Sequence, residues 1–107
     1  MTPSTTTYEW GDILLVAFPR TDATGTLKRP ALALYDEGDE DVMVARITTQ
    51  TARSKSDIAL TDWKSAGLLA PSVVRLSKVA TIKKSLVDRL LGALTPTEAN
   101  ITGFGIV

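Results

Sequence analysis

Residues 12–18 read DILLVAF, a nearly continuous apolar run that is closed by Pro19. Short apolar runs bounded by turn residues are typical of buried β-strands. Four further runs of this kind follow along the chain. They are ALALY (31–35), DVMVARIT (41–48), DIALT (57–61) and SVVRLSKVATI (72–82). Short strands in such close succession favour a small β-barrel or sandwich, a mainly β fold with minor α content.

Three segments between and after these runs carry other signals. The segment KSLVDRLLGAL (84–94) fits a helical stripe as well as a buried strand, and we favour a strand. Thr61 can cap a short internal helix that ends at Gly67. Thr95, Pro96 and Glu98 predict a C-terminal helix, with a capping threonine, a proline at the first helical position and a glutamate that completes a capping box.

The length and composition bound the architecture. A chain of 107 residues forms one domain, which we place at 10–107 after a flexible N-terminus at 1–9. The chain has no cysteine and no histidine, so disulfides, thiolate metal sites and histidine acid–base chemistry are excluded. We expect no cofactor and no metal. No targeting or membrane-spanning segment is recognisable, and the expected location is the cytoplasm, away from membranes.

The charges are unevenly distributed, although the net charge is zero. The stretch DEGDED (36–41) holds five of the twelve acidic residues, so the rest of the chain carries twelve basic residues against seven acidic ones. We expect this stretch to form a hairpin turn that points away from the body. The body would then present a positive surface that suits a phosphate backbone.

A basic pair in the stretch GTLKRPALAL (25–34) raises a specific question. Lys28 and Arg29 stand directly before Pro30 and an apolar run. One explanation is a solvated turn, because charged residues mostly lie at the surface. The other is a phosphate-binding or catalytic role, and the rest of the chain has to decide between them.

Several segments in fixed order answer part of this question. They are GDILLVAFP (11–19), DATGTLKRPAL (22–32), ARITTQ (45–50), WKSAGLLAPSVVR (63–75) and IKKSLVDRLLGALT (82–95). In this order and spacing they resemble the MazF/PemK family of toxins from bacterial type II toxin–antitoxin systems. The resemblance implies an SH3-like β-barrel with a C-terminal helix and a homodimer. It also implies a metal-independent endoribonuclease that cleaves single-stranded RNA, a cognate antitoxin as partner, and contact with DNA only through that antitoxin.

The resemblance also assigns site residues. Arg29 lies where the family has its cleavage-site arginine, and Thr48 lies where the family has the partner threonine. Arg75 corresponds to a third basic position that some members use. We expect the RNA-binding surface to include a larger set of polar and basic residues: Arg20, Lys28, Arg46, Thr49, Gln50, Arg53, Lys55 and Arg75.

The chemistry of metal-free RNA cleavage favours such residues independently. The ribose 2′-hydroxyl attacks its own 3′-phosphate, and a planar guanidinium can bind two oxygens of the resulting phosphorane. A threonine hydroxyl can donate a further hydrogen bond there. The general base stays open, because Ser77 stands where some members have an aspartate. Glu9, Asp12 and Asp22 are the candidates.

Base stacking and two rival functions complete the expectations. Phe18, with Arg20 beside it, is a candidate for stacking on an RNA base. One rival function is a catalytically weak barrel that acts only by protein binding, such as pairing with an antitoxin. The other is poisoning of DNA gyrase in the manner of the CcdB toxins. The pair Arg29 and Thr48 favours cleavage, because neither rival function needs it.

Overall fold

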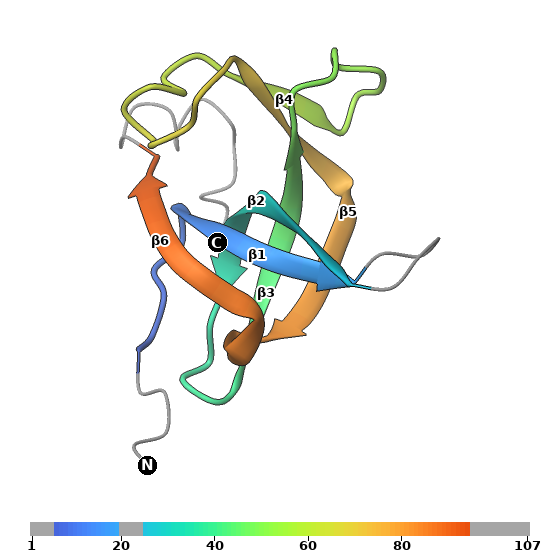
Figure 1. Ribbon diagram of the computed structural model, residues 1–107. Coiled ribbons are helices and arrows are strands. Elements are labelled where there is room, and N and C mark those ends of the chain that lie inside the picture. The colour runs from blue at the N-terminus through green and yellow to red at the C-terminus, as the bar shows by residue number, and fades with distance from the viewer. Residues whose placement is uncertain (1–5, 20–24, 95–107) are drawn as a thin grey trace.

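The computed structural model describes residues 6–19 and 25–94, which form a single antiparallel sheet of six strands (Figure 1). The order across the sheet is β4-β5-β3-β2-β1-β6. The predicted mainly β fold is confirmed, and all five predicted strands are present. Four of them lie within one residue of their expected bounds, and the second begins at Thr26, five residues before its expected start. The strands are β1 (Asp12–Pro19), β2 (Thr26–Tyr35), β3 (Asp41–Thr48), β4 (Asp57–Leu60), β5 (Ser72–Lys83) and β6 (Val87–Ala93).

The sheet is strongly curved (Figure 1), but it does not close into the small SH3-like barrel that we expected. β4 and β6 lie at its two edges, and within the described residues no ladder joins them. The connection from β4 to β5 packs against β6 instead. At this contact a Cβ atom added to Gly67 would overlap the carbonyl of Leu91, and one added to Gly92 would overlap the carbonyl of Ala66. The β4–β5 connection and β6 are therefore joined by close backbone packing at two glycines, and not by strand pairing.

The predicted internal helix is also wrong, because residues 61–67 form a series of turns. Their backbone hydrogen bonds span unequal numbers of residues: Ala66 N donates to Asp62 O, Gly67 N to Lys64 O and Leu68 N to Trp63 O. So short a segment is a poor helix on its own, and burial of Ala66 and Leu68 in the core sets its path. The predicted C-terminal helix lies outside the described residues.

The ambiguous segment 84–94 is mostly extended, as we favoured. It begins with a single turn of 3₁₀ helix, η1 (Lys84–Leu86), and continues as β6. In the ranges that the structure describes, no helix has the length and apolar character needed to cross a bilayer.

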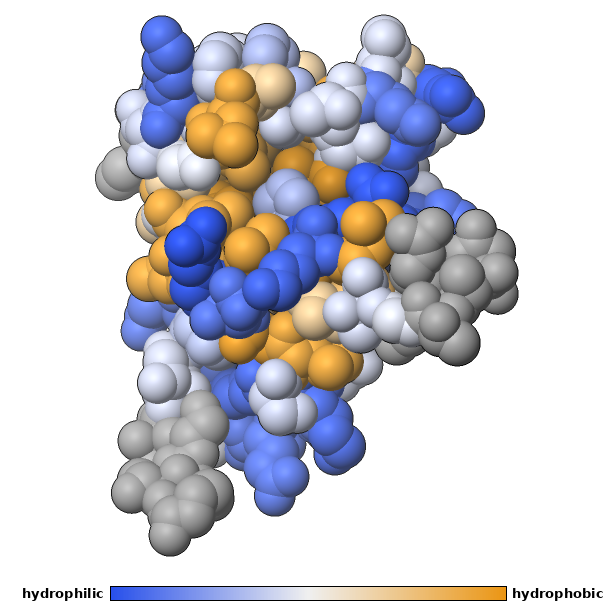
Figure 2. Space-filling model, viewed as in Figure 1, coloured by the Kyte–Doolittle hydropathy of each residue, from blue (hydrophilic) through white to orange (hydrophobic). Residues whose placement is uncertain are grey.

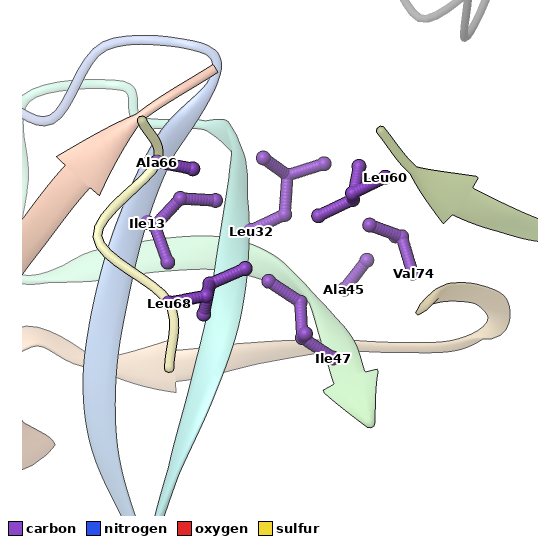
Figure 3. Packing of buried hydrophobic residues seen from close by; sticks show 8 residues of the cluster. All are labelled: Ile13, Leu32, Ala45, Ile47, Leu60, Ala66, Leu68 and Val74. Carbon is purple, nitrogen blue, oxygen red and sulfur yellow. The ribbon is translucent and has the colours of Figure 1, made fainter. Parts of the chain in front are cut away.

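The central strands are buried on both faces, and each face has its own hydrophobic cluster. Figure 3 shows the first cluster, where side chains from five strands and from the β4–β5 connection converge. Its members are Ile13, Leu32, Ala45, Ile47, Leu60, Ala66, Leu68 and Val74. The second cluster uses the alternate residues of β1, β2 and β3, as the two-residue period of a strand requires. Its members are Leu14, Val16, Ala31, Ala33, Val42 and Val44, covered by Tyr8, Phe18, Ile82, Leu86 and Val87.

The acidic stretch at 36–41 comprises the β2–β3 turn and the first residue of β3, but it does not point wholly into solvent. Glu37, Asp39 and Glu40 are exposed. The side chain of Asp36 is fully buried, where it binds Lys84 and accepts a hydrogen bond from the backbone N–H of Tyr8. The expectation of a wholly solvated acidic turn is therefore wrong at Asp36, because a buried cation holds that carboxylate.

Candidate functional site

A row of facing residues crosses four strands of the sheet. Ala31 of β2 faces Arg46 of β3, Arg46 faces Arg75 of β5, and Arg75 faces Asp57 of β4. Residues that face one another in an antiparallel sheet project from the same side of it. The row therefore runs from the buried second cluster at Ala31, through two arginines, to a carboxylate on the edge strand.

The neighbouring row brings Arg29 and Thr48 to the same side. Because Ala31 faces Arg46, two further residues along each antiparallel strand bring Arg29 opposite Thr48. Formal pairing of β2 with β3 stops at Ala31, one residue after Pro30, which has no N–H to donate. Arg29 is still paired on its other side, with Val16 of β1. The basic pair thus lies inside β2, and the alternative of a solvated turn is wrong.

An irregularity in the pairing of β5 with β3 places a further cation, Lys78, near these rows. Ala45 faces Val79, but the next residue of β3, Arg46, faces Arg75, so that three extra residues are inserted on β5. Such a bulge bends its strand and redirects the side chains there. The backbone N–H of Leu76, within the insertion, donates to the carbonyl of Ser56 at 3.0 Å, which fixes the bulge to the loop before β4.

These rows, the bulge and the loop after β3 enclose a pocket of about 320 Å³. Five of its lining residues are cationic, and the other two are a threonine and a glutamine. No carboxylate is among them. The lining residues are Arg29, Arg46, Thr48, Gln50, Arg53, Arg75 and Lys78. A pocket with this lining attracts polyanions and offers many hydrogen-bond donors to them.

Two donors in the pocket have groups left for a ligand. The hydroxyl of Thr48 accepts the backbone N–H of Gln50 at 3.2 Å, so its own hydrogen can be donated elsewhere. The Nε atom of Arg29 is buried and has no hydrogen-bond partner in the described part of the chain. An unsatisfied buried donor is unfavourable, so rearrangement of this guanidinium around an anion would be favoured.

Arg75, in contrast, is held at two points. Its Nη1 atom donates to Oδ2 of Asp57 at 2.9 Å, and its Nη2 atom donates to Oε1 of Gln50 at 3.2 Å. The same Oδ2 atom accepts the backbone N–H of Arg53 at 2.8 Å. One carboxylate therefore anchors both Arg75 and the loop that carries Gln50 and Arg53.

The structure gathers most of the residues that the sequence singled out. Both expected catalytic residues and four of the expected RNA-binding residues line the pocket: Arg29, Thr48, Arg46, Gln50, Arg53 and Arg75. Lys28, Thr49 and Lys55 are exposed and lie outside this lining. Lys28 projects opposite to Arg29 and forms an ion pair with Asp88 of β6 at 3.2 Å. Arg20 lies outside the described residues.

Phe18 lies beside the pocket on β1. The guanidinium carbon of Arg46 is 5.9 Å from the centre of its ring, a cation–π contact. Phe18 is partly buried against the second cluster, so its position is fixed by the core.

Sequence reasoning missed two residues of the site. Lys78 lines the pocket because of the bulge, which no periodic pattern announces. The sequence pattern predicts Asp57 only as the first residue of a strand, since aspartate is rarely buried. The sequence carried no signal that its carboxylate would meet Arg75.

The pocket lining contains no carboxylate that could serve as the general base. Asp12 lies at the start of β1, where its Oδ2 atom accepts the backbone N–H of Glu9 at 2.8 Å. Neither Asp12 nor Glu9 lines the pocket, and Asp22 lies outside the described residues. Within 6–19 and 25–94, no group of three or more acidic side chains is arranged to hold a metal ion.

The curved sheet and its cationic pocket define a small, mainly β protein with a surface whose charge suits a polyanion. Comparison with family models gives the class a name: residues 9–101 match the model of the PemK-like, MazF-like toxins of type II toxin–antitoxin systems. The chain belongs to this family. A comparison with curated proteins finds no significant match.

Several solved structures of similar fold come from mycobacteria. The Mycobacterium tuberculosis toxin MazF-mt6 is 25% identical, with 86% of this chain and 88% of that chain covered and a TM-score of 0.69. An endoribonuclease from a mycobacterial species is 18% identical, with coverage of 94% and 88% and a TM-score of 0.71. Another mycobacterial endoribonuclease, in complex with its cognate antitoxin, is 19% identical, with coverage of 88% and 85% and a TM-score of 0.65.

Proposed function

We propose that this protein is the toxin of a toxin–antitoxin pair and a metal-independent endoribonuclease that cleaves single-stranded RNA in the cytoplasm. The observation that carries the proposal is the meeting of Arg29 and Thr48, on adjacent strands, in a pocket with four further cations. Membership of the toxin family supports the biological role. We further propose a cognate antitoxin and a second copy of the chain as its protein partners.

The pocket contains groups that suit one requirement of the proposed reaction, the stabilisation of negative charge. The 2′-oxygen of the ribose attacks the adjacent phosphorus, the bond from phosphorus to the 5′-oxygen breaks, and a 2′,3′-cyclic phosphate forms. The 2′-hydroxyl loses its proton to a base that stays unassigned, and the leaving 5′-oxygen takes up a proton to become a 5′-hydroxyl. The additional negative charge of the phosphorane is the feature that the enzyme must stabilise.

Arg29 and Thr48 divide this task. The guanidinium of Arg29 is permanently charged and can bind two non-bridging oxygens at once. The hydroxyl of Thr48 can donate to the same phosphorane, since the hydrogen bond from Gln50 occupies only one of its lone pairs. Preorganised donors of this kind commonly lower the barrier by about 3 kcal/mol each.

The remaining cations would bind the neighbouring phosphates. Arg46, Arg53 and Lys78 surround the two proposed catalytic residues. Such phosphate contacts do not distinguish one base from another, and their contribution to RNA affinity weakens as salt is added. We also propose that Phe18 stacks on an RNA base. The base would have to share the Phe18 ring with the guanidinium of Arg46.

A chelator experiment tests the proposal. The purified protein is incubated with single-stranded RNA in excess EDTA, and the ends of the products are analysed by mass spectrometry. We expect cleavage with 2′,3′-cyclic phosphate and 5′-hydroxyl ends. Strict dependence on added magnesium, or 5′-phosphate ends, would contradict the mechanism. Growth inhibition without any RNA cleavage would favour gyrase poisoning or another binding function.

A further inference from the structure

The carboxylate of Asp57 is buried at the edge of the pocket at a high cost in free energy. Its side chain has no exposed surface. The Oδ2 atom accepts hydrogen bonds from Arg53 N and Arg75 Nη1, but the Oδ1 atom is buried without any partner in the described residues. Burial of a carboxylate is strongly unfavourable unless it is paired, and half of this one is left unsatisfied. A residue so placed needs an explanation beyond stability.

Asp57 is paired with one particular cation of the pocket. Within the described ranges, the ion pairs join no carboxylate to Arg29, Arg46, Arg53 or Lys78. Arg75 alone among these lining cations has a carboxylate partner there, and its side chain is only 15% exposed. The bonds to Asp57 and Gln50 fix the plane of its guanidinium, because the fork of donors is rigid.

We propose that Asp57 is a positioning residue, which acts on RNA through Arg75. It holds the Arg75 guanidinium in one orientation against the pocket wall, ready to bind a phosphate oxygen without reorganisation. Through the backbone N–H of Arg53 it also fixes the loop between Thr48 and β4. This inference rests on the proposed ribonuclease function for its kinetic consequence, but the geometry of Arg75 in the free protein can be tested without it.

The test is a double-mutant cycle with the nearly isosteric change Asp57→Asn. Single and double variants with Arg75→Gln are compared with the wild type for kcat and KM on a short RNA. If Asp57 acts through Arg75, Asp57→Asn lowers kcat about tenfold in the wild-type background and has no further effect in the Arg75→Gln background. Equal losses in both backgrounds, or no loss at all, would overturn the inference.

A matched control separates positioning from a general change of charge. Asp88→Asn also removes one negative charge, but Asp88 is exposed and pairs with Lys28 outside the pocket. It should leave kcat unchanged. The dissociation constant of an uncleavable 2′-deoxy oligonucleotide is measured alongside. Asp57→Asn should not raise this dissociation constant. The pocket gains net positive charge, although Arg75 loses its orientation.

A second measurement needs neither a variant nor cleavage. In the wild-type protein, ¹⁵N NMR of the arginine side chains should show restricted rotation of the Arg75 guanidinium, and the exposed Arg89 serves as the reference. Free rotation of Arg75 would overturn the inference even if Asp57→Asn failed to fold. If the wild type does not cleave RNA, the proposed function fails, while the NMR result and oligonucleotide binding still decide the role of Asp57.

Discussion

The ammonium group of Lys84 lies 2.9 Å from Oδ2 of Asp36, and both side chains are almost completely buried. The same ammonium donates to the carbonyl of Thr6 at 2.8 Å, and Tyr8 N donates to the same Oδ2 atom at 2.7 Å. This cluster joins the N-terminal segment, the β2–β3 turn and η1. It lies at the opposite end of β3 from the cationic pocket, so it concerns stability rather than the site.

Loss of the Lys84 charge should therefore destabilise the fold. Lys84→Met leaves Asp36 as an uncompensated buried charge, and we expect a loss of about 3 kcal/mol in the free energy of unfolding. Urea denaturation followed by circular dichroism measures it. The neighbouring Lys83 is exposed, and its Nζ atom lies 3.9 Å from Oδ1 of Asp41, which is a long ion pair. Lys83→Ala should therefore change stability by less than about 0.5 kcal/mol. Equal effects of the two changes would contradict this account.

The same cluster predicts a loss of stability in acid. Burial alone would raise the pKa of Asp36, but hydrogen bonds from Lys84, Tyr8 N and Gly38 N outweigh it and lower the pKa from its ordinary value of 3.8. A carboxyl group whose pKa is lower in the folded state contributes stability above its unfolded pKa. That contribution is lost as the pH falls below about 4 towards the lowered value.

Urea titrations from pH 2 to pH 6 test this acid dependence. Asp36→Asn should flatten the dependence below pH 4, whereas Glu37→Gln in the exposed part of the same turn should leave it unchanged. An unchanged slope for Asp36→Asn would show that other carboxylates control acid unfolding.

Replacement of Arg29 should separate catalysis from phosphate binding. If Arg29 stabilises the phosphorane, Arg29→Ala should lower kcat/KM at least about a hundredfold, equivalent to roughly 2.7 kcal/mol. Arg29→Lys should be nearly as poor, because a point charge does not bind two oxygens in one plane. Cleavage is measured on a fluorescent RNA with Lys83→Ala as the control. Wild-type rates for Arg29→Ala would place the active site elsewhere.

The close approach of Gly67 and Gly92 predicts two costly substitutions. Gly92→Ala introduces a methyl group where the carbonyl of Ala66 already lies, and the resulting shift should cost about 3 kcal/mol. Gly67→Ala should cost more, because its φ of +86° is also unfavourable for alanine. Thermal denaturation compares them with Gly38→Ala, which has φ of +93° but open space around it. Gly38→Ala should cost about 1 kcal/mol, and similar values for all three would refute the packing argument.

The proposed homodimer needs a surface outside the two clusters. Leu76 packs on the first cluster and Ile82 on the second, so these residues of β5 are already used within the chain. Val79 of β5 and Leu90 of β6 remain exposed, at 43% and 54%. On the face drawn in Figure 2, hydrophobic surface is interrupted by hydrophilic residues. Sedimentation at micromolar concentration should give twice the chain mass, and a monomer there would contradict the proposal.

Much of the fold could be predicted because strands with buried faces leave a readable pattern. The run at 41–48 coincides with β3, and the run at 12–18 ends one residue before β1 does. The start of β2 was missed, since Lys28 and Arg29 before a proline suggest a turn when their pairing with β1 is unknown. The internal helix failed because tertiary packing of Ala66 and Leu68 outweighed local capping signals.

The site was less predictable than the fold. Arg29 and Thr48 were predicted through resemblance to a family, and the register of β2 and β3 explains why residues so far apart in sequence line one pocket. Lys78 depends on an insertion of three residues in β5, and Asp57 on burial of a charge. Both are properties of the pairing between strands, which a single sequence does not display.

The pairing of β1 with β6 also orders events during synthesis. Of the strands that the structure describes, β1 is the first to be made and β6 is the last, yet Asp12 faces Ala93 and Val16 faces Val87. One side of β1 therefore has no partner until the ribosome has released nearly the whole described chain. The strands that carry Arg29, Thr48 and Arg75 are complete earlier, but a nascent chain stopped before Val87 lacks β6 and leaves an open sheet edge. Such a product is a ready substrate for proteases and for aggregation.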